Sequence, residues 1–115
     1  MSRIYLDYIN DILESINDIE MFVGKRTFEK FQKDKKTVNA VVRSLEIIGE
    51  AAKNIPKETR IANPVIPWAK MAGMRDKLSH EYFGIDVVLL WNTIKENLPP
   101  LKPLLTKIKE HEDKK

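Results

Sequence analysis

The chain has 115 residues, of which 43% are apolar and 32% are charged, with a net charge of +3 and no cysteine. This composition excludes a disordered chain and favours a single domain over residues 1–115 with a core of its own. The lack of cysteine excludes disulfides, thiolate zinc sites and cysteine catalysis. No apolar run approaches the ~20 residues that cross a bilayer. Residues 1–10 carry no export signal, so we expect a cytoplasmic protein without membrane contact.

The first predicted element is an amphipathic helix over about residues 3–23, ending at Gly24. Apolar side chains recur there at the three-to-four spacing of one helix face: Tyr5, Tyr8, Ile9, Ile12, Ile16, Ile19 and Phe22 or Val23. Thr27 can then cap a short turn that carries Phe28 and Phe31. A basic run follows at residues 33–36.

A second helix is predicted over about residues 36–54, with an apolar face formed by Val38, Val41, Val42, Leu45, Ile48, Ala52 and Ile55. Gly49 in its interior lowers helix stability by ~1 kcal/mol relative to alanine, which suggests that another backbone packs closely there. Glu46 and Glu50 could form a carboxylate pair. Arg43 and Lys53 lie at helical spacing from them, and this spacing favours ion pairs instead.

Prolines punctuate the second half of the chain. Pro56, Pro64 and Pro67 bound an irregular connection, and Pro67 suits the first turn of a third helix running to about Ser79. Asp86 is a suitable N-cap for a fourth helix, whose inner face carries Val87, Leu90, Trp91, Ile94 and Leu98.

After Pro99, Pro100 and Pro103, which kink or restart the fourth helix, a fifth segment carries Leu101, Leu104, Leu105 and Ile108. No run shows the alternation of a half-buried strand. We therefore predict an all-α fold, an up-and-down bundle of four to five helices, with a charged, frayed tail from about residue 109.

Charge is unevenly distributed along the chain. Residues 1–24 carry one basic and five acidic groups, residues 25–36 carry six and two, and residues 56–80 carry five and two. The two basic segments could attract a polyanion, although scattered, solvated lysines explain the same counts.

Arg75, His80 and Tyr82 form the most informative pattern: an arginine, four residues, a histidine, one residue and a tyrosine. The other histidine, His111, lies in the charged tail, so His80 is the well-placed group that can move protons near neutral pH. Arginine stabilises anionic oxygens and histidine is a common general acid or base, a combination that suits phosphate-ester chemistry.

Each of these residues also has a purely structural interpretation. Arg75 could be a solvated surface group, His80 a helix C-cap, and Tyr82 a core or interface aromatic. Asp76 and Glu81 could bind a weak magnesium ion, but no histidine or cysteine cluster supports a metal site. The set Trp68, Met71, Met74 and Trp91 is interpreted as core or dimer contact.

The Arg-x4-His-x-Tyr pattern resembles the signature of the HEPN (higher eukaryotes and prokaryotes nucleotide-binding) domains, in particular the HepT-like branch. The flanking sequence resembles that branch as well, at residues 42–52, 74–76 and 80–86, at Trp91 and at residues 98–101. The likeness extends from about residue 3 to residue 108. One variation is Asp76, where relatives often have asparagine.

The resemblance implies a HEPN-like helical bundle and a homodimeric endoribonuclease that needs neither metal nor cofactor. Arg75 and His80 would be catalytic and Asp76 could orient one of them. The protein would be the toxin of a type VII-like toxin–antitoxin pair. Its cognate antitoxin, a minimal nucleotidyltransferase, would transfer AMP to Tyr82 and so block RNA from the site.

Helix geometry adds a separate argument for a dimer. Successive helix residues turn by ~100°, so a continuous helix would put His80 about 140° from Arg75. Either the helix ends near Ser79, or the site combines residues of two chains. Cleavage by 2′-hydroxyl attack needs both a base and an acid, and two chains supply two histidines. The alternative function is a non-catalytic subunit that binds nucleotide or docks the nucleotidyltransferase.

Overall fold

The structure is a computed structural model that describes residues 2–78 and 86–113. All the secondary-structure elements within these ranges are helices, so the all-α prediction is confirmed. The elements are α1 (Ser2–Val23), α2 (Phe28–Lys33), α3 (Lys35–Lys53), α4 (Lys57–Ala62), α5 (Trp68–Leu78), α6 (Val87–Asn92), the π-helical turn η1 (Thr93–Asn97) and α7 (Leu101–Asp113). The first two long helices lie within one residue of their predicted bounds.

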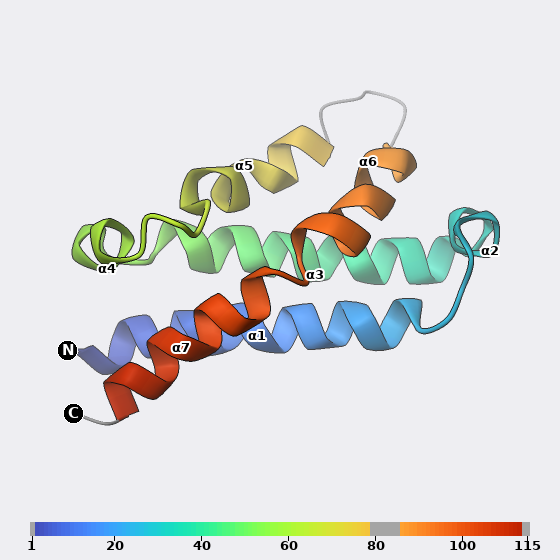
Figure 1. The fold of residues 1–115 in the computed structure, drawn as a ribbon. Coiled ribbons are helices and arrows are strands. Elements are labelled where there is room, and N and C mark those ends of the chain that lie inside the picture. Colours follow the sequence, from blue (N-terminus) through green and yellow to red (C-terminus); the bar gives the residue numbers. More distant parts are fainter. Residues whose placement is uncertain (1, 79–85, 114–115) are drawn as a thin grey trace.

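The long helices run up and down the molecule (Figure 1). α1 and α3 form an antiparallel pair, α5 packs on the side of α3, and α7 lies along α1. The short helix α2 joins α1 to α3 at one end of the bundle, while both chain termini lie at the other end. The bundle is elongated, with extents of 46 × 29 × 20 Å.

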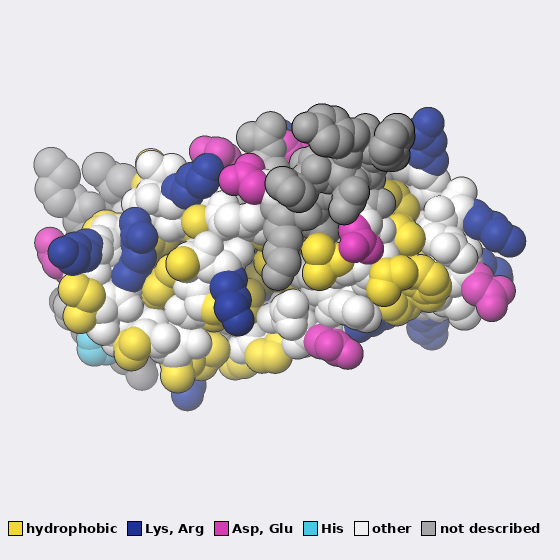
Figure 2. All heavy atoms as spheres, turned by 90° about the horizontal axis from the view of Figure 1, so that it is seen from above, with side chains coloured by type: hydrophobic (Ala, Val, Ile, Leu, Met, Phe, Trp, Pro, Cys, Tyr) yellow, Lys and Arg dark blue, Asp and Glu magenta, His cyan; other side chains and the backbone are white. Residues whose placement is uncertain are grey.

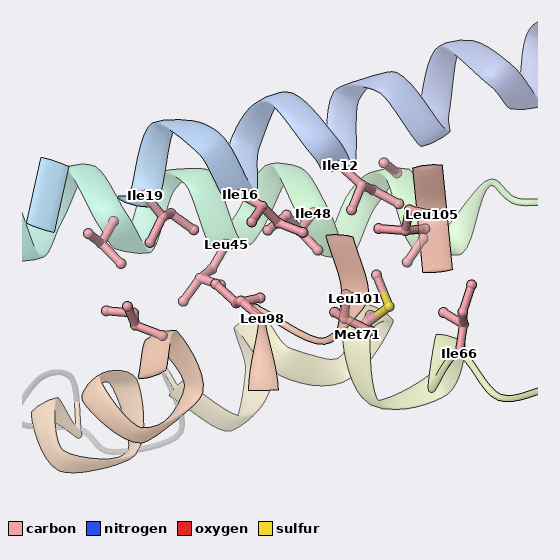
Figure 3. Packing of buried hydrophobic residues seen from close by; sticks show 14 of the residues in the cluster. Ile12, Ile16, Ile19, Leu45, Ile48, Ile66, Met71, Leu98, Leu101 and Leu105 are labelled. Atoms are coloured by element: carbon pink, nitrogen blue, oxygen red, sulfur yellow. The ribbon is translucent and has the colours of Figure 1, made fainter. Parts of the chain in front are cut away.

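Apolar side chains from α1, α2, α3, α5, α6, η1 and α7 fill the core. Figure 3 shows residues of α1 and α3 directed toward residues of α5, of α7 and of the chain just before α7: Ile12, Ile16, Ile19, Leu45, Ile48, Met71, Leu98, Leu101 and Leu105. Burying each such side chain contributes roughly 1.5–3 kcal/mol. Trp68 and Met71 are 6% and 1% exposed within their own chain. Of the two interpretations given for this pair, core or dimer contact, the structure supports the core, because one chain already covers both side chains.

Two side-chain caps stabilise the helix starts at the α2 end of the bundle. Thr27 caps α2, as predicted, by accepting from the Lys30 amide. Asp34 caps α3: it accepts from the Thr37 hydroxyl at 2.6 Å and the Thr37 amide at 3.1 Å, and it pairs with Arg26 at 3.3 Å. The hydrogen bonds from Thr37, followed by the charge of Arg26, lower the pKa of Asp34. The cap therefore stabilises the fold above the ordinary carboxyl range and is lost as the pH falls through the lowered pKa.

The connection after α3 is more regular than predicted. The prolines predict an irregular segment bounded by Pro56 and Pro67, whereas the structure has the six-residue helix α4 within it. The Arg60 side chain explains why so short a helix is held. Its Nε donates to the Ile55 carbonyl at 2.9 Å and its Nη2 to the Lys53 carbonyl at 3.3 Å, so it satisfies backbone acceptors that the end of α3 leaves open.

The predicted fourth helix is interrupted by a π turn. Asp86 caps α6 as expected, accepting from the Leu89 amide at 3.0 Å. At η1 the Leu98 amide donates to the Thr93 carbonyl, five residues back. Pro99 and Pro100 follow directly, and a proline ring clashes with the carbonyl four residues before it, so a wider turn relieves the crowding. α7 then continues through residues 109–113, and the fraying of that tail stays a prediction.

A close helix contact lies at Gly49, as its position in the sequence suggested. A Cβ atom placed on Gly49 would lie 3.4 Å from the Met71 carbonyl oxygen and 3.5 Å from that of Ala72. The missing side chain lets the α5 backbone rest directly on α3.

We expect Gly49→Ala to retain parental stability or gain up to about 1 kcal/mol, because one methyl group fits and alanine favours a helix. Gly49→Leu should lose roughly 1–3 kcal/mol, because its longer side chain meets the α5 backbone. Urea unfolding followed by circular dichroism measures both variants. A leucine variant as stable as the parent would show that the contact is not tight.

Candidate functional site

The helix that carries the start of the motif is anchored at its first turns. Pro67 precedes α5, and the Trp68 indole donates to the Asn63 carbonyl at 3.1 Å. Met71 is buried and lies against Gly49 of α3 through its carbonyl. Arg75 follows Met71 by one helical turn, so the bundle core fixes its backbone position.

The structure places only part of the predicted site. Arg75 and Asp76 lie in α5, and the Asp76 side chain is exposed. The Arg75 side chain, His80 and Tyr82 lie outside the described residues, so their roles stay predictions. Within residues 2–78 and 86–113, the Asp76 carboxylate makes no hydrogen bond or ion pair.

The helix that follows the motif is also anchored, by its cap and by one buried leucine. The Asp86 carboxylate caps α6, and the Asp86 carbonyl accepts from the amide of Leu90, which is fully buried. The Thr93 hydroxyl is buried and donates to the Leu89 carbonyl at 2.8 Å. α5 and α6 lie on the same side of α3 (Figure 1). Residues 79–85 are therefore bracketed by two helices that the core holds in place.

An aromatic cluster joins α6 to the α2 end of the bundle. The Trp91 ring meets Phe28 edge-on at 5.7 Å between centroids and lies 5.2 Å from Phe31. The ammonium of Lys95 lies 4.7 Å from the Trp91 centroid, within cation–π range. This cluster could not be predicted from the sequence, because nothing in the linear pattern pairs α2 with α6.

Other kinds of site find little support in the described residues. Among them, no three His, Cys, Asp or Glu side chains gather as metal ligands, and no helix is long and apolar enough to cross a membrane. A shallow pocket of about 260 Å³ lies between the end of α1 and η1, lined by Glu20, Val23, Gly24, Ile94, Lys95 and Pro99. None of the described residues that line it belongs to the motif.

Comparison with known proteins gives a consistent result. The sequence profile of the family described as "Ribonuclease HepT-like" matches residues 12–108. A "Probable ribonuclease HepT" of Thermococcus cleftensis is 53% identical over 110 residues, covering 96% of this chain and 100% of that protein. A "Putative RNase" of Methanocaldococcus jannaschii is 48% identical over 92 residues, covering 80% of this chain and 76% of the relative.

A second "Putative RNase", of Caldanaerobacter subterraneus, is 45% identical over 105 residues, covering 91% of this chain and 94% of that protein. No solved structure matches the chain significantly. The family profile spans most of the helical bundle and the whole Arg75–Tyr82 motif, and relatives of similar length share about half of its residues. The chain belongs to the HepT-like ribonuclease family.

Proposed function

We propose that this protein is a metal-independent endoribonuclease, the toxin of a toxin–antitoxin pair. The observation that carries the proposal is the HepT-like match over residues 12–108, which contains Arg75, His80 and Tyr82. The fold supports it, because α5 and α6 hold both ends of the motif segment against one core.

The chemistry follows from the side chains. One His80 takes the proton of the RNA 2′-hydroxyl, whose oxygen attacks the adjacent phosphorus. His80 of a second copy of the chain protonates the departing 5′-oxygen, so the products are a 2′,3′-cyclic phosphate and a 5′-hydroxyl. Arg75 binds the phosphate and stabilises the charge on its oxygens as the bond breaks. DNA lacks the 2′-hydroxyl and should resist cleavage.

The first functional prediction concerns metal and the two catalytic residues. Purified, unmodified protein incubated with total RNA should cleave it equally well with and without chelator. Arg75→Ala and His80→Ala should each reduce cleavage by at least about a hundredfold, since each removes charge stabilisation or proton transfer. Circular dichroism should show an unchanged helical fold.

Lys107→Ala serves as the matched control, because it removes an exposed basic side chain of α7 that lies outside the motif. Loss of activity in chelator, restored by magnesium, would contradict the mechanism. A parent protein that binds a nucleotidyltransferase but never cleaves RNA would instead support the alternative, a non-catalytic nucleotide-binding or docking subunit.

We also propose that the active species is a two-fold homodimer whose two motifs share one site. One chain supplies a single suitable histidine, whereas the reaction uses a base and an acid. A two-fold axis duplicates both His80 and Arg75 around one phosphate.

Mixing chains tests this arrangement. Parent and His80→Ala chains are combined in equal amounts and allowed to exchange partners. Activity should fall to about a quarter of that of the same total amount of parent protein, because only parent homodimers, about one quarter of all dimers, hold two His80 side chains. Independent sites would leave about half. Mixing with Lys107→Gln chains, which change an exposed residue of α7, should leave full activity.

Tyr82 is the proposed point of control. A cognate minimal nucleotidyltransferase would join the Tyr82 oxygen to the α-phosphorus of ATP and release pyrophosphate. The added phosphate charge and nucleotide bulk, two residues from His80, would repel RNA.

Tyr82→Phe separates this control from catalysis. The variant keeps the ring and loses the hydroxyl, so it should cleave RNA at close to the parental rate. With the nucleotidyltransferase and ATP, the parent should gain the mass of AMP and lose activity, while Tyr82→Phe should do neither. An inactive Tyr82→Phe variant would assign the hydroxyl to the reaction itself.

A further inference from the structure

The α2 end of the bundle combines exposed positive charge with partly exposed aromatic rings. Five exposed lysines lie there, none of which makes an ion pair with a described residue: Lys25, Lys30, Lys33, Lys35 and Lys36. Arg26 is paired with Asp34, which leaves Glu29 as the one unpaired acid among residues 25–36. In Figure 2, Lys and Arg side chains surround this end of the molecule and hydrophobic side chains gather beside it.

The aromatic rings face the same region. Phe28 and Trp91 are each only partly buried, and Val88, one turn before Trp91, is 56% exposed. The exposed Lys95 side chain places its ammonium over the Trp91 ring, so this surface also carries a positive charge. The acids nearest in the sequence to Val88, Trp91 and Lys95 are Asp86 and Glu96; both are exposed, and the Asp86 carboxylate is engaged as the α6 cap.

Chain connectivity keeps this surface near the motif. Asp86 follows His80 by six residues, which can span at most about 20 Å. Trp91 lies five helical residues further on, about 7.5 Å along the axis. Trp91 is therefore within about 30 Å of His80 whatever path residues 80–86 follow, a distance that a short single strand can cover.

We propose that Phe28, Trp91, Lys95 and the α2 lysines form a binding subsite for the single strand that flanks the cleaved phosphate. This inference rests on the proposed ribonuclease function. Bases stack on the aromatic rings while the lysines contact the phosphates, as in proteins that bind single strands without reading a sequence. Duplex RNA binds more weakly, because its bases are already stacked.

Charge argues against a second copy of the chain as the occupant. A two-fold contact sets the same patch against itself, so the unpaired lysines of two α2 ends would meet and repel. A polyanion instead neutralises them and releases counterions.

The test uses His80→Ala protein, which binds RNA without cutting it, and a fluorescein-labelled single-stranded RNA of about 12 nucleotides. Anisotropy gives the affinity at several salt concentrations. Trp91→Leu should weaken binding about fivefold to a hundredfold, and Trp91→Phe less, because a ring remains. Lys30→Gln with Lys33→Gln should lower the salt slope by about 1.4, that is about 0.7 for each phosphate contact.

A matched control changes charge equally at the other end of the bundle. Lys107→Gln with Lys109→Gln removes two exposed lysines of α7 and should leave the salt slope unchanged. Bound RNA should also quench tryptophan fluorescence through Trp91. The Trp91→Phe variant, which retains only the buried Trp68, should lose that quenching even if Trp91→Leu proves unstable.

Parental affinity and salt slope in both the Trp91 and the lysine variants would overturn the subsite. So would a Trp91→Leu protein that becomes monomeric in sedimentation while binding RNA as before, since the patch would then be a contact between copies. Single-stranded DNA of the same sequence separates this inference from the proposed function. It should compete at the subsite without being cleaved, whereas RNA cleavage by the parent tests the ribonuclease activity alone.

Discussion

The contact between α3 and α5 at Gly49 is the constraint on which the position of the motif depends. Without a side chain on Gly49, the backbone oxygens of Met71 and Ala72 approach α3 to within 3.5 Å of where a Cβ atom would be. Met71 and Trp68 are buried at the same contact, so α5 can neither slide nor rotate without opening the core. Arg75 is one turn further along this helix, so the contact also determines the position of its backbone.

The structure describes the helices on both sides of residues 79–85. The protein holds the ends of this segment, through the Met71 contact on one side and the Asp86 cap and buried Leu90 on the other. The residues proposed to act on RNA lie at and between these ends. Rigid elements that present a short functional segment are common in enzymes, because the scaffold can then be stable while the segment meets its substrate.

Much of this architecture could be predicted from the sequence. The three-to-four spacing in residues 3–23 and 36–54, and the caps at Thr27 and Asp86, depend only on local periodicity and hydrogen bonding, and each was found in the structure. Gly49 was informative because a glycine in a helix interior has a cost that packing must offset.

The features that sequence reasoning missed depend on contacts distant in the chain or on competing local effects. α4 is stabilised by Arg60, which donates hydrogen bonds to the Ile55 and Lys53 carbonyls. The positions of the prolines do not predict these hydrogen bonds. The π turn arises where Pro99 and Pro100 act on the helix before them. The motif residues were found by their chemistry and by resemblance to a family rather than by periodicity, and their geometry stays a prediction even though the family is established.

The distribution of charge connects these parts. α1 is acidic and packs on α3 and α7, where Glu20 pairs with Lys102 at 2.8 Å. Five lysines that make no ion pair with a described residue gather at the α2 end, close to Phe28 of α2 and Trp91 of α6. A net charge of only +3 would attract a polyanion weakly if it were spread evenly. Because α1 carries five acidic groups and residues 25–36 carry six basic and two acidic groups, a modest net charge can still present a basic surface where we propose that the RNA strand lies.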